Sequence, residues 1–124
     1  MNVVLWIAQV LLAAAYVLAG GGKAFRPLPA LSKQMTWVSS VPPAFVRFVG
    51  AAELLGAIGL VLPIVTGVAP WLTVAAAAGL VLLQVCAITF HLSRNEARVV
   101  PTNVVLLLLA ALVLIGRVAI VPVA

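Results

Sequence analysis

The sequence predicts an all-α integral membrane protein, a bundle of four transmembrane helices. Of its 124 residues, 66% are hydrophobic and 7% are charged, and the mean hydropathy is +1.35. A water-soluble domain of this size could not bury so much apolar surface. A transmembrane helix needs about 20 residues, so the chain accommodates four spans with short connections. The apolar stretches are continuous, which disfavours a β-barrel. We therefore expect a single transmembrane domain over residues 1–124.

The first span is expected over residues 2–22. It contains no charged residue, and no basic residue precedes it, which indicates a retained helix rather than a cleaved signal peptide. Three consecutive glycines, residues 20–22, are expected to end the helix just before Lys23. Gln9, Tyr16 and Lys23 recur every seven residues and so share one stripe of this segment.

The connection to the second span is broken by four prolines, Pro27, Pro29, Pro42 and Pro43. Between the two proline pairs, apolar residues recur at near-helical spacing, namely Leu28, Leu31, Met35 and Val38, with Trp37 beside them. This spacing predicts a short interfacial helix that lies on the membrane and can act as a lid. An ordinary solvated loop is the alternative.

The remaining spans are expected over residues 44–62, 71–91 and 101–118. Arg47 lies close enough to the start of the second span for its side chain to reach the headgroups. An uncharged turn over residues 63–70 leads to the third span, in which residues 75–79 form a small-residue face suited to close packing. Pro101 opens the fourth span, and Arg117 lies near its far end.

The basic residues predict the orientation of the chain. One face carries the first and third loops and six basic residues, Lys23, Arg26, Lys33, Arg47, Arg94 and Arg98. The other face has Arg117. By the positive-inside rule, loops 1 and 3 are cytoplasmic and both termini lie outside, in what we expect to be a bacterial inner membrane. Trp6 and Trp71 then fall together at the outer boundary, as in an aromatic belt.

Composition disfavours several classes of function. The net charge is +5, but the basic residues are scattered over loops without the patch or fold motif of a nucleic-acid binding protein, so no nucleic-acid partner is expected. Cys86 is the single cysteine, which rules out an intramolecular disulfide or a CxxC redox pair. One His and two Glu are too few and too scattered to predict a metal site.

Glu53 is the most informative residue, because it places a carboxyl group in the middle of an apolar span. An ionisable group near the bilayer centre costs about 2.5 to 3.5 kcal/mol on insertion scales, so it normally faces the bundle interior and has a partner or does chemistry. Gly50 and Gly56 share its helix face, which allows close helix approach and leaves room for a cavity. The alternative is a structural Glu that only holds helices together.

Polar side chains of different spans are expected in two layers. With a rise of about 1.5 Å per residue, the inner layer lies roughly 10 to 14 Å deep, and its members are Tyr16, Glu53 and Gln84. The second layer, nearer the cytoplasmic mouth, consists of Lys23, His91 and Asn103. Together they describe a funnel of hydrogen-bonding groups that ends on a carboxyl group. Each residue also has a structural alternative. Tyr16 and Gln84 can be interhelical hydrogen-bond partners, His91 an interfacial residue, and Lys23 a charge that only sets the membrane orientation.

Three stretches of the chain resemble the DoxX-like family of small four-helix membrane proteins. They are Gly20-Gly21-Gly22-Lys23, the segment 49–63 with its G-x-x-E-L-x-G-x-x-x-L-x-x-P pattern, and Thr89-Phe90-His91. The resemblance covers essentially the whole chain and implies a four-helix bundle, with Lys23, Glu53 and His91 at positions that the family tends to keep. Relatives include a subunit of a thiosulfate:quinone oxidoreductase and a membrane partner that links redox enzymes, while similar bundles serve sterol isomerases that use intramembrane acids. The resemblance identifies neither an activity nor a cofactor.

The leading hypothesis is a Glu53-centred cavity that binds a lipophilic small molecule, quinone- or isoprenoid-like, with acid–base chemistry such as isomerisation or cyclisation. The expected catalytic residues are Glu53 and His91, and the expected ligand-binding residues are Tyr16, Lys23, Gln84 and Asn103. The alternative is a non-catalytic membrane subunit or anchor of a redox or stress-response complex, with a redox enzyme or a second copy as partner. A transporter is less favoured, because no pair of Gly/Pro-broken helices is present.

Overall fold

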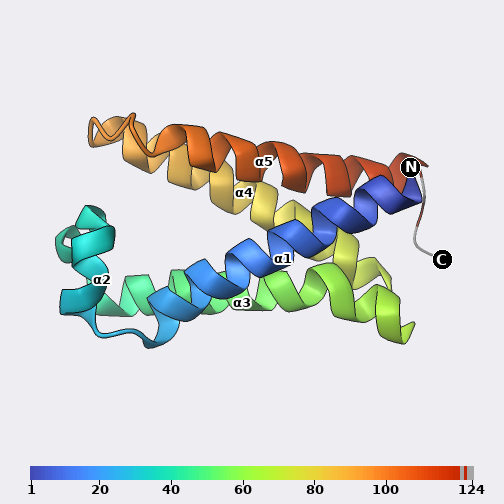
Figure 1. Cartoon of the computed structure of the whole chain (residues 1–124), viewed down its shortest axis with the longest axis horizontal. Helices are drawn as coiled ribbons and strands as arrows, with labels where there is room; N and C mark the ends of the chain where they lie inside the picture. Colours follow the sequence, from blue (N-terminus) through green and yellow to red (C-terminus); the bar gives the residue numbers. More distant parts are fainter. Residues whose placement is uncertain (121, 123–124) are drawn as a thin grey trace.

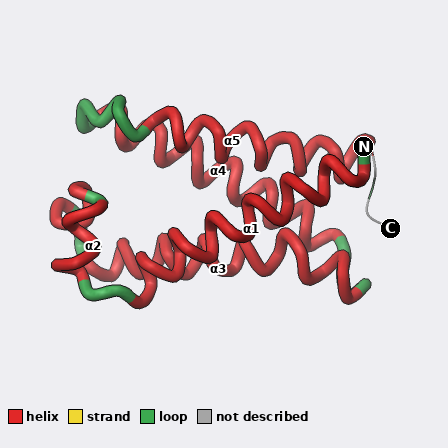
Figure 2. The backbone as a smooth tube through the Cα atoms, in the orientation of Figure 1, coloured by secondary structure: helices red, strands yellow, loops and turns green. Residues whose placement is uncertain are grey.

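The computed structural model describes residues 1–120 and 122, except for the side chains of Gln34 and Thr36. Helices make up most of this part of the chain, which contains no strand (Figure 2). In chain order the elements are α1 (Asn2–Phe25), α2 (Leu28–Gln34), η1 (Thr36–Ser40), α3 (Pro43–Thr66), α4 (Trp71–Ser93), α5 (Val100–Ile115) and η2 (Gly116–Ile120). The prediction of an all-α fold is confirmed.

Four helical stretches are long and apolar enough to cross a membrane, namely α1, α3, α4 and α5 together with η2. The most apolar 18-residue window of each has a mean hydropathy of at least 2.1. Helices α1 and α3 have 24 residues each, which corresponds to about 36 Å at 1.5 Å per residue. That length exceeds the hydrocarbon thickness of about 30 Å. The protein is therefore a multi-pass membrane protein, as predicted.

Two helices end later than predicted. Helix α1 continues through its three glycines to Phe25, and α3 continues through Pro63 to Thr66. In hydrocarbon every backbone polar group must be satisfied within the helix, so residues that would end a helix in water are tolerated. Gly67 ends α3 with a φ of 73°, the left-handed conformation in which glycine commonly terminates a helix.

Glycines bring the backbones of α1 and α3 into contact. A Cβ atom on Gly50 would lie 2.7 Å from the Gly20 carbonyl oxygen and 2.5 Å from the Ala24 nitrogen, so neither atom leaves room for a side chain. Small residues allow this close approach, which is typical of membrane helix interfaces. Lys23 follows Gly20 by one turn and Glu53 follows Gly50 by one turn. The crossing therefore brings Lys23 and Glu53 together.

The four long helices form two pairs, α1 with α3 and α4 with α5 (Figure 1). The pairs meet near the N-terminal end of α1, and their backbones diverge toward the end that carries α2. The main core contains residues of all four helices, namely Ala8, Leu12, Tyr16, Ala57, Leu60, Ala77, Leu80, Ala110 and Val113.

The short helices α2 and η1 lie at this wide end, where the two pairs diverge (Figure 1). They form the helical element predicted between the first two spans. Leu31 and Val38 of the predicted apolar stripe are buried against Val46 of α3. The stripe therefore packs on the start of α3, which rules out the alternative of an ordinary solvated loop.

Candidate functional site

The centre of the candidate site is an ion pair between α1 and α3. The Lys23 Nζ atom lies 2.5 Å from the Glu53 Oε1 atom, and the two side chains are only 14% and 3% exposed. Sequence reasoning assigned these residues to different layers because it ended α1 at Gly22. Since α1 stays helical to Phe25, the Lys23 side chain extends back along α3 to the carboxylate.

A second pair joins α1 to α4 inside the core. The Gln84 Nε2 atom donates to the Tyr16 hydroxyl oxygen at 2.5 Å, and both residues are buried. Because the hydroxyl accepts through its oxygen, its hydrogen stays available for donation. Gln84 Oε1 is buried and has no hydrogen-bond partner in the part of the chain that is described. The predicted inner layer thus contains one spare donor and one spare acceptor.

His91 belongs to a separate cluster at the end of α4. Its Nδ1 atom lies 3.1 Å from Glu96 Oε1, and Arg94 Nε donates to the same oxygen at 2.9 Å. The structure thus places the predicted catalytic His91 against Glu96 rather than Glu53. Asn103 of α5 has a buried Nδ2 atom for which the described residues provide no hydrogen-bond partner.

Trp37 of η1 connects the two clusters. Its ring centroid lies 5.9 Å from that of Phe90 and 6.4 Å from that of His91, both edge-on, and Lys23 Nζ lies 5.9 Å from the Trp37 centroid. Edge-to-face and cation–π contacts of this kind are favourable. Sequence reasoning noted Trp37 only as a neighbour of the apolar stripe. The sequence feature that could have indicated these contacts is the single Trp in the short segment between the first two spans.

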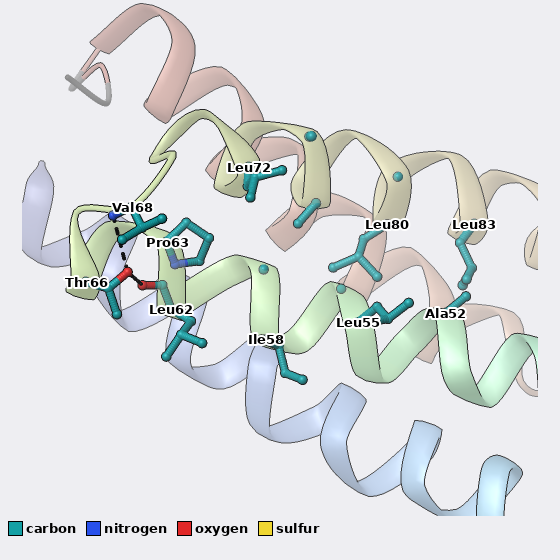
Figure 3. Close-up of a pocket in the computed structure, with 15 residues that line it drawn as sticks. Ala52, Leu55, Ile58, Leu62, Pro63, Thr66, Val68, Leu72, Leu80 and Leu83 are labelled. Atoms are coloured by element: carbon teal, nitrogen blue, oxygen red, sulfur yellow. Dashed lines mark hydrogen bonds between the residues drawn. The ribbon is translucent and has the colours of Figure 1, made fainter.

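An apolar groove of about 640 Å³ lies between α3 and α4 (Figure 3). Its lining side chains come from both helices, and small residues such as Gly56, Gly59 and Ala76 make the space. The groove extends from Ala52 and Leu83 at one end to residues 66–68 at the other. It does not reach the Glu53 carboxylate, which contacts Lys23 instead, so the cavity expected around that carboxylate stays a prediction.

The chain matches the DoxX-like family over residues 7–113. It is a member of that family. The match covers the Lys23–Glu53 pair, the Tyr16–Gln84 pair and His91, and confirms the resemblance seen in the sequence. No curated protein and no solved structure gives a significant match to this DoxX-like protein. The four spans and the family together establish a lipid bilayer as its environment.

The polar groups of this DoxX-like protein occupy one region between α1, α3 and α4. Tyr16 and Lys23 lie seven residues apart on the same stripe of α1, about 10 Å along the helix, so α1 carries one member of each pair. The region offers an ammonium group, a carboxylate, a hydroxyl donor and an amide acceptor. Such a set can hold a small polar head group and move a proton to or from it.

Sequence reasoning missed a further polar network at the other end of α1. Arg117, predicted as an isolated charge at the outer boundary, is buried and donates from Nε to Gln9 Oε1 at 2.8 Å. Gln9 Nε2 in turn donates to the Leu60 carbonyl oxygen at 2.5 Å. The stripe shared by Gln9, Tyr16 and Lys23 was the sequence signal, because all three side chains point into the bundle.

Proposed function

We propose that this DoxX-like protein binds the head group of a lipophilic small molecule, quinone- or isoprenoid-like, between α1, α3 and α4. The observation that carries the proposal is the Lys23–Glu53 ion pair inside an apolar bundle. A buried ion pair is a weak source of stability, since apolar residues of similar volume often stabilise a fold more. Ionisable groups within transmembrane helices usually mark a functional site.

The unpaired polar atoms support recognition of a head group with hydroxyl or carbonyl oxygens. A buried acceptor without a partner costs about 1 to 3 kcal/mol, and Gln84 Oε1 is such an acceptor. A ligand hydroxyl that donates to Gln84 Oε1 recovers this cost. A ligand carbonyl can accept the free hydrogen of Tyr16. A quinone offers carbonyls to the Tyr16 hydroxyl, its reduced form offers hydroxyls to Gln84 Oε1, and an isoprenoid alcohol offers a hydroxyl that can bind either group.

The groove between α3 and α4 supports an apolar tail on the same molecule. Its inner end is formed by Ala52 and Leu83, which directly precede Glu53 and Gln84 in their helices (Figure 3). From Ala52 to Thr66 the groove follows 15 residues of α3, and the 14 steps between them correspond to about 21 Å at the helical rise. An isoprenoid chain of that length fits such a surface, with its head at the level of the polar groups.

Glu53 is the proton-transferring group of this proposal. An isomerisation balances within the site, because the carboxylate removes a proton from one ligand carbon and returns it to another, and needs no oxidant. Lys23 stabilises the negative charge that develops on the ligand in between. We assign His91 to the support of Trp37 rather than to proton transfer, since its Nδ1 atom contacts Glu96.

We further propose that Lys23 and the loop after α4 face the cytoplasm and that both termini lie outside. The charge asymmetry of the sequence supports this orientation. The N-terminus lies at the end of the bundle opposite to α2 (Figure 1). Cysteine labelling of Asn2→Cys in a Cys86→Ala background should then succeed from outside intact cells. Labelling that requires permeabilised cells would reverse the orientation.

Ligand retention tests the proposed site. Purified protein in nanodiscs is titrated with a decyl-tailed benzoquinone or a geranylgeranyl alcohol, and bound molecules are counted by native mass spectrometry. Gln84→Leu removes the acceptor for a ligand hydroxyl, so we expect it to weaken retention of the geranylgeranyl alcohol roughly tenfold. Glu53→Gln removes the titratable group and should weaken retention of both probes by a similar factor. Glu96→Gln makes the same change at the other acidic residue and serves as the matched control.

The rival function, an anchor for a redox or stress-response complex, predicts a different result. Neither probe would then be retained by the parent protein, and Glu53→Gln would behave like Glu96→Gln. A co-purifying protein would instead be lost when the loop over residues 94–99 is replaced. That combination would exclude the ligand-binding site.

A further inference from the structure

Arg117 is a buried arginine at the end of the bundle opposite to the proposed ligand site. The residue is only 4% exposed, although it lies in the last helical segment, η2. Its Nε atom donates to Gln9 Oε1 at 2.8 Å and its Nη1 atom donates to Asn2 Oδ1 at 2.7 Å. The Trp6 ring lies over the guanidinium, with its centroid 5.5 Å from Cζ.

The guanidinium has no acidic partner within the described residues. The chain contains two acidic residues. Glu53 is paired with Lys23, and Glu96 is paired with His91 and Arg94. The two hydrogen bonds of Arg117 go to neutral amide oxygens, and its Nη2 atom is buried without a partner in the part of the chain described. A buried positive charge of this kind strongly favours a bound anion.

A shallow hollow of about 410 Å³ lies on the surface of α1, next to the residues that contact this arginine. It is lined by Asn2, Val3, Trp6, Ile7, Val10 and Leu11, all on one side of α1. Two of these residues, Asn2 and Trp6, also contact the guanidinium. The hollow is thus an apolar surface along α1, and the two residues at its outer end, Asn2 and Trp6, separate it from the Arg117 guanidinium.

The start of α1 adds donors at the same place. The first backbone hydrogen bond of the helix runs from Leu5 N to Met1 O, so the amides of residues 2–4 have no acceptor within the helix. Met1 provides no side-chain cap. The N-terminus of a helix carries a partial positive charge, which adds to that of Arg117. Free amides and a guanidinium together form a site for a phosphate group.

Close packing holds Arg117 at this position. A Cβ atom on Gly116 would overlap the side chain of Leu5, which is fully buried, so η2 rests directly on the start of α1. The segment Gly116–Ile120 is a π-helix, an uncommon conformation that is frequent at functional sites.

We propose that this end of the bundle binds an anionic phospholipid. The phosphate contacts Arg117 and the free amides at the start of α1, and one acyl chain lies in the hollow along Ile7 and Val10. Trp6 lines the hollow and also packs on the guanidinium, so it lies between the acyl chain and the phosphate in this arrangement. The site is independent of the proposed function, because it shares no residue with the Lys23–Glu53 region.

Native mass spectrometry of the full chain tests this site. The protein is titrated with phosphatidylglycerol, with phosphatidylcholine of the same acyl chains, and with oleate. We expect phosphatidylglycerol to bind about tenfold more tightly than either, and Arg117→Gln to abolish most of that preference. Arg98→Gln removes the same charge from the exposed loop after α4 and should change nothing. Equal binding of the three amphiphiles, or equal effects of the two substitutions, would overturn the proposal.

A second variant covers the case in which Arg117→Gln fails to fold. Val10→Trp fills the hollow but leaves Arg117 and its hydrogen bonds in place, and Val10 is 53% exposed, so the fold should tolerate it. We expect it to weaken phosphatidylglycerol binding severalfold without changing the melting temperature in detergent. Undiminished binding would show that the hollow holds no acyl chain and would contradict the proposal.

Discussion

The two ends of α1 each hold a cation against the bundle, but in different ways. Lys23 is paired with a carboxylate at 2.5 Å, so its charge is balanced by the chain itself. Arg117 is surrounded by neutral amides and a Trp ring, and its charge is unbalanced within the described residues. Under the two proposals above, the first arrangement serves proton exchange and the second binds an anion from outside. The same helix thus holds a paired cation at one end and, at the other, a cation without an acidic partner among the described residues.

The largest loss of stability is expected when the charge balance at the Lys23 end is broken. Glu53→Leu leaves Lys23 unpaired in a largely apolar setting, so we expect the free energy of unfolding to fall by about 3 to 5 kcal/mol. Equilibrium unfolding in mixed detergent micelles measures it. A loss as small as that of a surface ion pair, below about 1 kcal/mol, would mean that Lys23 simply turns to solvent.

The next largest loss of stability is expected at the crossing of α1 and α3, which brings Lys23 and Glu53 together. Gly50→Ala places a methyl group against backbone atoms of α1, so the helices must separate, and overpacking of this kind costs about 1 to 3 kcal/mol. Gly21→Ala is the matched control in α1, because a Cβ there meets nothing within 4 Å. The control should be neutral or stabilising by up to about 1 kcal/mol. Equal effects on the melting temperature would refute the close crossing.

At the other end, Arg117→Met should cost less than loss of Glu53. The substitution removes a charge that has no acidic partner, and leaves the amide oxygens of Gln9 and Asn2 without a donor. We expect a loss of about 1 to 3 kcal/mol in detergent, with a larger loss in the presence of phosphatidylglycerol. A loss independent of the lipid would assign Arg117 a purely structural role.

The smallest effect concerns Trp37, which links the two clusters at the wide end. Trp37→Leu removes its edge-to-face contacts with Phe90 and His91, so we expect a loss of about 0.5 to 1.5 kcal/mol. Trp71→Leu is the control, because Trp71 is largely exposed. If the two substitutions have the same effect on unfolding, the link through Trp37 contributes nothing to the fold.

The contrast between the two ends also shows what the sequence can predict. Hydropathy alone predicted the four spans, and the cost of a charge in hydrocarbon predicted that Glu53 is buried. The partner of Glu53 was missed because three glycines indicate a helix end in water, whereas here α1 continues through them and Gly20 lets it touch α3. The contacts of Arg117 were missed because its partner Gln9 lies 108 residues away in the chain. A terminal arginine is also expected to reach the headgroups rather than the core.

The double variant Lys23→Met/Glu53→Leu tests the central claim most directly, that the ion pair is kept for binding and proton exchange rather than for stability. Replacement of a buried ion pair by apolar residues is often neutral or stabilises by about 1 to 4 kcal/mol. We therefore predict that the double variant unfolds at or above the parent temperature, far above Glu53→Leu, while it no longer retains the quinone and isoprenoid probes. A double variant that unfolds as early as Glu53→Leu, or that retains the probes like the parent, would contradict the account.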